Sequence, residues 1–301
     1  MRSQYVGRFA PSPTGELHFG SLVAAVASYA DAKSHNGSWL LRIDDIDQPR
    51  SVGGSSESII ASLKAFGFQW DGPIRWQSER EHHYQAAIAY LRNQSLAYPC
   101  RCSRRQIETT ARHGVEGLVY PGTCREWNGM GADQTAIRML TKNVRVRAAD
   151  RITGDITQNL EADIGDFIIF RADGITAYQL AVVVDDFLDN VTHVVRGADL
   201  VLSTPRQIYL QNKLNYRALQ YAHVPLVRDA EGAKISKRDD AHPIDLVEPL
   251  SALKAAWQFL KQAPMPEPIK NLEHFWTHAA ETWRIEVLRD TDTPVSGEEI
   301  A

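Results

Sequence analysis

Cysteine is scarce in this sequence, and long apolar runs are missing. Three of the 301 residues are cysteine, which excludes the dense disulfide framework of small secreted domains. No uninterrupted apolar stretch approaches the roughly 18 residues that a membrane helix needs, and the longest candidate, Gln179–Val184, has only the length of a strand. The first residues, MRSQYVGRFAPSPTG, contain no apolar signal-peptide core. We therefore expect a cytoplasmic protein whose thiols are reduced.

A large net charge is also absent. The 33 basic and 37 acidic residues give a net charge of −4, which argues against a uniformly basic nucleic-acid binder. With 44% hydrophobic and 23% charged residues, the composition is that of a globular chain rather than a disordered or collagen-like one. The charge is uneven, because residues 100–151 hold ten Arg and Lys against five Asp and Glu. This basic segment predicts a local phosphate-binding surface, and a solvated face with scattered arginines is the alternative.

Strand-like and helix-like segments alternate at the start of the sequence and again later. Apolar spacing and turn residues predict strands over Tyr5–Phe9, Trp39–Ile43, Asp166–Arg171, Val191–Val195 and Val224–Val227. They predict helices over Leu17–His35, from a cap at Ser55 or Ser56 to Phe66, and over Glu79–Arg92, Pro205–Leu214 and Leu253–Leu260. This order is typical of an α/β domain with a parallel sheet. Because Pro99 and clustered glycines interrupt the pattern, we expect residues 98–190 to be an insertion in that domain.

Two short motifs, far apart in the sequence, are suited to binding a nucleotide. In His18-Phe-Gly20-Ser21, a loop leads into a predicted helix, where backbone N–H groups and the helix dipole favour a phosphate. Gly20 lets a flat ring or a phosphate approach the backbone, and His18 can donate to phosphate oxygens. In Lys234-Ile-Ser-Lys237-Arg238, two lysines on a glycine-flanked loop can follow a moving triphosphate.

The three cysteines are close together in the sequence, as Cys100-x-Cys102 followed by Cys124. Reduced thiols at this spacing predict a structural Zn²⁺ site, which needs a fourth ligand for tetrahedral coordination. On chemistry alone the natural fourth ligand is His113, because imidazole binds zinc far more often than a phenol does. Three cysteines without a metal are the alternative.

Taken together, the two nucleotide motifs resemble the signatures of class I aminoacyl-tRNA synthetases. His18–Ser21 is similar to His-Ile-Gly-His, and Lys234–Arg238 is similar to Lys-Met-Ser-Lys-Ser. The block Arg8–Gly15 resembles glutamyl-tRNA synthetases, since glutaminyl enzymes tend to have Pro, Glu and Asn where this sequence has Ala10, Ser12 and Thr14. The sequence departs from the signatures at Phe19, Ser21, Ile235 and Arg238.

The resemblance implies roles for individual residues. It implies that His18 and Lys237 are catalytic and that ATP is bound by His18, Gly20, Ser21, Lys234 and Lys237. Glutamate has two carboxylates and one ammonium group, so its pocket needs two cationic groups and one anion. The matching residues are Arg8, Ala10, Ser12, Asp44, Tyr178 and Arg196.

Two points stay open within this resemblance. Asp44 stands where the family usually has glutamate, and either arginine can take either carboxylate of the substrate. For the metal, the resemblance points to Tyr120 as the fourth ligand beside the three cysteines, whereas chemistry alone favours His113.

The number of residues after the second motif narrows the resemblance. Only 63 residues, Asp239–Ala301, follow it, too few for the anticodon-binding region of a full glutamyl-tRNA synthetase. The sequence is thus similar to the glutamyl-queuosine tRNA(Asp) synthetases. This implies a Rossmann-like nucleotide-binding domain with a parallel sheet, an inserted zinc-containing acceptor-type subdomain and a short helical C-terminal part. The expected division is 1–97 and 191–242 for the two halves of the catalytic domain, 98–190 for the insertion and 243–301 for the C-terminal part.

The same resemblance implies a reaction and its partners. L-glutamate is activated with ATP and Mg²⁺ to glutamyl-adenylate without tRNA, and glutamate is then transferred to the queuosine in the anticodon of tRNA(Asp). It also implies structural zinc, and we expect a monomer. The alternatives are a truncated or specialised glutamyl-tRNA synthetase charging a tRNA 3′ end, an adenylyltransferase of the same fold, and a non-catalytic paralogue.

Overall fold

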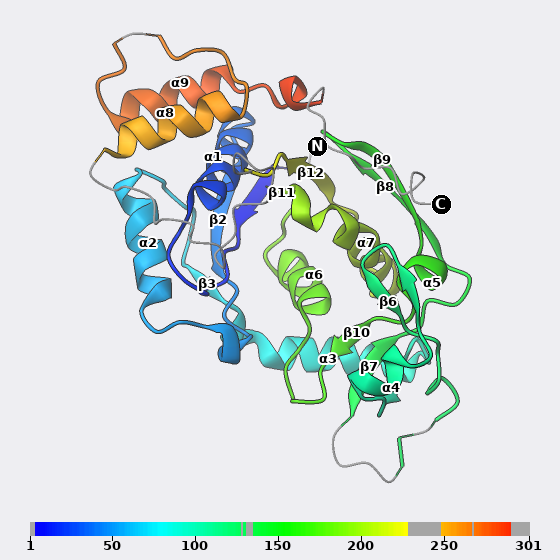
Figure 1. Ribbon diagram of the computed structural model, residues 1–301. Coiled ribbons are helices and arrows are strands. Elements are labelled where there is room, and N and C mark those ends of the chain that lie inside the picture. Colours follow the sequence, from blue (N-terminus) through cyan, green and yellow to red (C-terminus); the bar gives the residue numbers. More distant parts are fainter. Residues whose placement is uncertain (1–3, 128, 131–134, 228–247, 267, 290–301) are drawn as a thin grey trace.

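A parallel sheet forms the centre of the computed structural model (Figure 1), which describes residues 4–127, 129–130, 135–227, 248–266 and 268–289. Its first part contains, in this order, the parallel strands β1 (Val6–Phe9), β2 (Ser38–Ile43) and β3 (Arg75–Trp76). Its second part begins with the parallel strands β11 (His193–Gly197) and β12 (Gln220–Val224). The N–H of Thr192 donates to the carbonyl of Val6 at 2.9 Å, so β11 lies beside β1. The predicted α/β fold with a parallel sheet is confirmed.

Two strands of the expected insertion extend this sheet. β8 (Arg145–Asp150) pairs in parallel with β12, and β9 (Gly154–Asn159) pairs antiparallel with β8. Side chains of β8 alternate between exposed and buried, as in a strand with one solvated face. The division at residues 98 and 190 stays a prediction, but sequence reasoning missed that this segment shares a sheet with the second half of the catalytic domain.

Most of the remaining insertion forms a smaller layer at the lower right of Figure 1, whereas its last helix, α6 (Tyr178–Leu188), lies near the centre. An antiparallel sheet joins β10 (Ile168–Phe170), β7 (Ala136–Met139) and β4 (Ala97–Cys100) in that order. This layer also contains α4 (Arg104–Glu108), the hairpin of β5 (Arg112–Gly114) and β6 (Gly117–Val119), and α5 (Leu160–Asp163). It carries all three cysteines.

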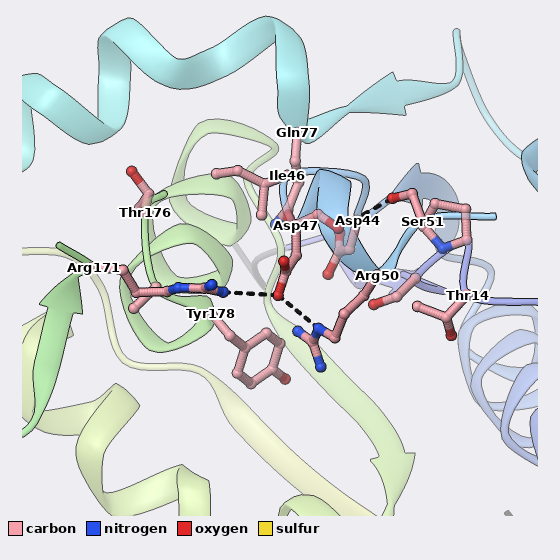
Figure 2. A pocket seen from close by; sticks show the side chains of 13 residues that line it. Thr14, Asp44, Ile46, Asp47, Arg50, Ser51, Gln77, Arg171, Thr176 and Tyr178 are labelled. Carbon is pink, nitrogen blue, oxygen red and sulfur yellow. Dashed lines mark hydrogen bonds and ion pairs between the residues drawn. The ribbon is translucent and has the colours of Figure 1, made fainter. Parts of the chain in front are cut away.

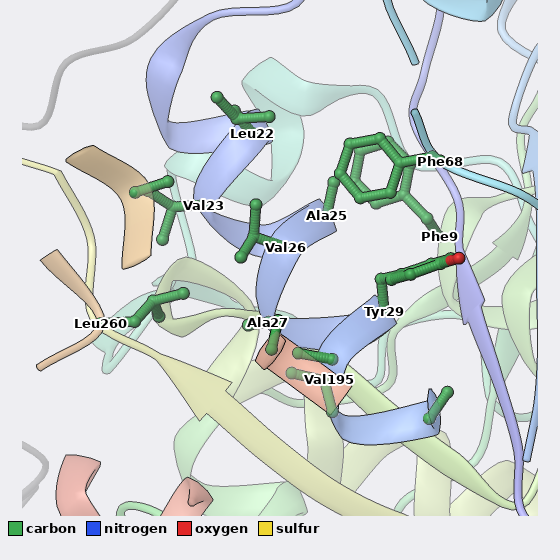
Figure 3. Packing of buried hydrophobic residues seen from close by; sticks show 14 of the residues in the cluster. Phe9, Leu22, Val23, Ala25, Val26, Ala27, Tyr29, Phe68, Val195 and Leu260 are labelled. Atoms are coloured by element: carbon green, nitrogen blue, oxygen red, sulfur yellow. The ribbon is translucent and has the colours of Figure 1, made fainter. Parts of the chain in front are cut away.

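The helix α1 (Phe19–Ser34) lies at the centre of the main hydrophobic core and is buried over most of its length. It packs against β1 and β11 of the sheet and also against α8 (Pro249–Phe259) and α9 (Leu272–Thr282) (Figure 1). In Figure 3, Tyr29 of α1 lies on the side of Phe68, whereas Val23 lies on the side of Leu260. A helix covered on several sides has no solvated stripe, which explains why its apolar and small residues run all round it.

The remaining helices frame the sheet and the pocket described below. They are α2 (Ser55–Ala65), α3 (Glu81–Asn93), α6 (Tyr178–Leu188) and α7 (Thr204–Lys213), with short 3₁₀ helices at Gln48–Arg50, Gln77–Arg80, Ala198–Ser203 and Ile285–Leu288. Of the helices in the described ranges, none combines the length and the hydropathy needed to cross a membrane.

Most predicted elements lie within a few residues of their expected bounds, but three details are corrected. The strand predicted over Val224–Val227 is wrong, because β12 ends at Val224 and the following proline cannot donate to a sheet ladder. The apolar run Gln179–Val184, for which length alone suggested a strand, is helical and belongs to α6. Ser55 does not cap α2, which follows Gly54; its hydroxyl instead donates to the carbonyl of Gly15 at 2.5 Å and ties α2 to the loop before α1.

Candidate active site

The N-terminus of α1 carries the first predicted nucleotide motif. His18 directly precedes the helix; its Nδ1 accepts from the N–H of Ser21 at 3.3 Å, and the Ser21 hydroxyl lies 3.1 Å from its Nε2. A Cβ on Gly20 would lie 3.1 Å from the ring of His18. Glycine therefore leaves room for the imidazole itself, where sequence reasoning assigned the space to a nucleotide. Lys234 and Lys237 of the second motif lie outside the described residues.

Five of the six residues predicted to bind glutamate line one cavity of about 80 Å³. Arg8 and Arg196 come from the adjacent strands β1 and β11, Asp44 follows β2, and Tyr178 begins α6. Ala10 completes the set. Parallel strands present their carboxyl ends at the same edge of a sheet, so residues distant in sequence converge there, as is usual for ligand sites in open α/β folds.

A second cavity of about 210 Å³ adjoins the first (Figure 2). Ser12, the sixth predicted residue, lines it together with Asp44, which borders both cavities. Here Asp47 Oδ2 accepts from Arg50 Nε at 2.6 Å and from Arg171 Nη1 at 3.0 Å. Sequence reasoning assigned no role to these two arginines.

Beneath the first cavity, buried charged residues form a network that sequence reasoning missed. Arg42 donates through Nε to Asp44 and through Nη1 to Asp186, both at 2.7 Å. Asp186 also accepts from Arg8 Nε at 3.2 Å. All four side chains are buried. A signal was available in the sequence, because an Asp–Asp pair inside an apolar helix needs cationic partners when it is buried.

Burial and charge shift the two acids of this network in opposite directions. Burial raises the pKa of Asp44 to about 6, although the charge of Arg42 opposes the rise. Burial also acts on Asp186, but the guanidinium groups of Arg8 and Arg42 outweigh it and hold the pKa of Asp186 below its usual value. The site thus has one acid that stays ionised and positions Arg8, and a second acid that titrates near pH 6.

Arg196 is held by neutral hydrogen-bond acceptors. Its Nε donates to His223 Nε2 at 3.0 Å, and its Nη2 donates to Thr204 Oγ1, also at 3.0 Å. Its Nη1 lies 3.4 Å from the hydroxyl of Tyr178, inside the cavity wall. Neutral acceptors orient a guanidinium without cancelling its charge, so Arg196 keeps its charge for a carboxylate, whereas Arg8 shares Asp186 with Arg42.

The three cysteines converge on one point, in the layer built by β4 and β7. The sulfur atoms of Cys100, Cys102 and Cys124 all lie within 4.8 Å of one another. The hydroxyl of Tyr120 is 3.4 Å from Cys100 Sγ and 3.5 Å from Cys102 Sγ. His113 is exposed in β5, where it pairs with Leu118 across the hairpin. Of the two candidates for the fourth ligand, the structure brings Tyr120 to the thiols.

A buried arginine supports this cluster from behind. Arg138 Nε donates to Cys100 Sγ at 3.2 Å, and its guanidinium carbon lies 3.8 Å from the centre of the Tyr120 ring. Its Nη1 donates to the carbonyl of Asp166 at 2.7 Å. These contacts fix the position of Cys100 Sγ and of the Tyr120 ring relative to each other.

Comparison with known proteins identifies the family to which the sequence is similar. The family described as tRNA synthetases class I (E and Q), catalytic domain, matches residues 4–263. The glutamyl-Q tRNA(Asp) synthetase of Dechloromonas aromatica is 46% identical over 292 residues, 96% of this chain and 97% of that protein. The protein of the same name from Thiobacillus denitrificans is 52% identical over 238 residues, 78% of each chain.

Among solved structures, a glutamate tRNA ligase from Elizabethkingia meningosepticum in complex with its amino acid has a similar fold, with a TM-score of 0.78 at 23% identity. The match covers 94% of this chain and 65% of that one. The match to the family and the sequence identities over most of the chain are consistent with this similarity of fold. The chain therefore belongs to the glutamyl-Q tRNA(Asp) synthetase family, within the class I tRNA synthetases of the E and Q group.

Proposed function

We propose that this protein activates L-glutamate with ATP in the absence of tRNA and then transfers the glutamate to queuosine in the anticodon of tRNA(Asp). The observation that carries this proposal is the identity of 46% across 97% of a protein named glutamyl-Q tRNA(Asp) synthetase. The convergence of Arg8, Arg196 and Asp44 on one small cavity supports glutamate as the amino acid.

The chemistry of this cavity fits glutamate. Two guanidinium groups, Arg8 and Arg196, match its two carboxylates, and Asp44 matches its ammonium group. The hydroxyl of Tyr178 adds a polar contact beside Arg196. Ala10 keeps the wall short, and Ser12 extends the site toward the adjoining cavity.

The first step forms glutamyl-adenylate. An oxygen of the α-carboxylate attacks the α-phosphorus of ATP, and the bond from that phosphorus to the bridging oxygen breaks, releasing pyrophosphate. His18 and the backbone N–H group of Gly20 stabilise the phosphate charge at the start of α1, where the N–H of Ser21 donates to His18 Nδ1. Lys234 and Lys237 stabilise it from the second motif. Mg²⁺ bound to the ATP screens the remaining charge.

The second step forms an ester. A hydroxyl of the cyclopentenediol of queuosine attacks the carbonyl carbon of the mixed anhydride, and the bond from that carbon to the phosphate oxygen breaks, releasing AMP. The proton of the hydroxyl passes to a phosphate oxygen of the adenylate. Holding both reactants in place supplies much of the rate enhancement, so no covalent enzyme intermediate is needed.

We also propose that Cys100, Cys102, Tyr120 and Cys124 bind a structural zinc ion. For tetrahedral zinc, two sulfur ligands lie about 3.8 Å apart, and a sulfur and an oxygen ligand about 3.5 Å apart. The separation of 3.5 Å between the Cys102 and Cys124 sulfurs and the distances of 3.4 and 3.5 Å to the Tyr120 hydroxyl fit this geometry. The ion would hold the insertion together and take no part in the reaction.

Two assays test the proposal. Glutamate-dependent exchange between ATP and pyrophosphate without tRNA should be seen, and glutamate should be transferred to tRNA(Asp) only when queuosine is present. Arg8→Ala and Lys237→Ala should each abolish exchange, whereas Arg217→Ala, at an exposed arginine on the protein surface, should leave it unchanged. Lack of exchange would refute the activation step, and charging of a tRNA 3′ end would refute the assigned acceptor.

A further inference from the structure

Three buried side chains from three neighbouring strands form a line that ends at the glutamate pocket. Asp150 is the last residue of β8, His223 lies in β12, and Arg196 lies in β11. His223 Nδ1 is 2.6 Å from Asp150 Oδ2, and His223 Nε2 is 3.0 Å from Arg196 Nε. Each of the three is less than a tenth exposed. The reaction described above uses neither Asp150 nor His223.

The proton on this imidazole can be assigned from its partners. An arginine Nε–H only donates, so His223 Nε2 must present its lone pair to Arg196. The ring proton is then on Nδ1, where it donates to Asp150. Burial lowers the pKa of His223 although Asp150 opposes this, so the ring is neutral at neutral pH. Three other residues lie close to this ring: Tyr221, Thr204 and Asp199. They do not change the assigned tautomer, because the Nε–H of Arg196 requires an acceptor at His223 Nε2.

The carboxylate at the far end of the line is itself fixed. Asp150 Oδ1 accepts from the N–H groups of Ile152 and Thr153, both at 2.9 Å, and from that of His223 at 3.3 Å. These donors leave only Oδ2 for the imidazole. The orientation of Asp150 is therefore set by the turn that joins β8 to β9, within the segment 98–190.

We propose that His223 is a positioning residue that transmits the orientation of Asp150 to Arg196 and thereby aims its guanidinium at a substrate carboxylate. This rests on the proposed function, in which Arg196 binds glutamate. An acid in direct contact with Arg196 would offset part of its charge, as Asp186 does for Arg8. A neutral imidazole fixes the guanidinium equally well and keeps the negative charge of Asp150 one ring away.

The substitution Asp150→Asn tests this directly. Because the three backbone donors require an oxygen at the Oδ1 position, the amide nitrogen must face His223 Nδ1. The ring proton then moves to Nε2 and points at the Nε–H of Arg196. Two opposed donors displace the guanidinium, and we expect KM for glutamate to rise roughly 10- to 100-fold. The KM for ATP should change less than about twofold, since Arg196 does not line the start of α1.

A pair of variants at the histidine separates positioning from structure. In His223→Gln, the amide oxygen can reach the place of Nε2 and accept from Arg196, so glutamate KM should stay within about threefold of the parent value. His223→Leu has no acceptor and should behave like Asp150→Asn. His193→Gln, at a half-buried histidine of β11 that stacks on Tyr5, is the matched control and should leave glutamate KM unchanged. Equal effects of the Gln and Leu variants would overturn the proposal.

The tautomer can be observed without measuring activity. With ¹⁵N-labelled histidine, the His223 signal, identified by its loss in His223→Gln, should show a protonated Nδ1 in the parent protein and a protonated Nε2 in Asp150→Asn. A protonated Nε2 in the parent would overturn the proposal even if the enzyme is active. If the parent shows the expected tautomer but no glutamate-dependent exchange, the proposed function has failed and the hydrogen-bond assignment has not.

Discussion

Asp44 is the acid proposed to bind the substrate ammonium, and its pKa gives the site a measurable pH dependence. The side chain is 7% exposed and lies 2.7 Å from Arg42. Burial raises its pKa from 3.8 to about 6. Only the carboxylate form can bind the ammonium group, so glutamate binding should weaken as the pH falls through 6.

The size of the effect follows from this pKa. With a pKa of about 6, Asp44 is roughly nine-tenths ionised at pH 7 and roughly one-tenth ionised at pH 5, so glutamate KM should rise about tenfold. With the ordinary value of 3.8, Asp44 would be almost fully ionised at both pH values and KM would hardly change. The side-chain carboxyl of glutamate, with a pKa near 4.3, alters binding by less than about a third over this range.

The assay is ATP–pyrophosphate exchange at several pH values, with glutamate and ATP varied separately. The pH dependence should be confined to glutamate KM, and Asp44→Asn should bind glutamate weakly and lose the dependence. A flat profile in the parent protein, or an unchanged profile in Asp44→Asn, would refute the assignment. The free energy of unfolding depends on pH in the opposite direction to glutamate binding. Because the pKa of Asp44 is raised in the folded protein, its contribution to stability is complete below pH 3.8 and is lost as the pH rises through 6.

Three further predictions concern the zinc cluster and the core. Tyr120→Phe should lower the zinc content measured by mass spectrometry of the intact protein, whereas His113→Ala should keep it; the reverse result would favour the histidine as ligand. Gly165 has φ +74°, and a Cβ there would lie 2.6 Å from the Tyr120 N–H nitrogen, so Gly165→Ala should cost about 1–3 kcal/mol of unfolding free energy in urea. Phe275 of α9 is fully buried against Trp257 and Trp276, and Phe275→Ala should cost about 3–5 kcal/mol; a much smaller loss would mean that α8 and α9 unfold separately from the sheet.

Features set by neighbouring residues were predictable from the sequence. The end of α1 is one: Asn36 with φ 52° and Gly37 follow the helix, and Asn–Gly is a common sequence at helix ends. The position of His18 at the start of α1 is another, since a loop with two prolines and a glycine precedes an apolar helix pattern. The convergence of Arg8 and Arg196 was inferred from the family resemblance, because nothing near either residue reveals the other.

Features set by distant residues were not predictable in this way. Asp186 accepts a hydrogen bond from Arg8, 178 positions away, and Asp150 pairs with His223, 73 positions away. The bounds of α9 were not predicted within the expected helical C-terminal part, although its apolar residues Phe275, Trp276 and Ala279 follow helical spacing. The helix begins at a cap, since the Asn271 side chain accepts from the N–H of His274 at 2.9 Å, and it packs against α1.

The adjacency of β1 and β11 also determines when the fold can form during synthesis. Val6 leaves the ribosome 186 residues before Thr192, the residue whose N–H it binds. At a translation rate of about 5–20 residues per second, β1 stays unpaired on this edge for about 9 to 37 s until β11 is synthesised. Over that interval Asp186 is not yet available to Arg8. The guanidinium of Arg8, which is buried in the folded protein, therefore stays hydrated in the nascent chain. Completion of the sheet and assembly of the amino-acid pocket are therefore the same late event in the life of each newly made molecule.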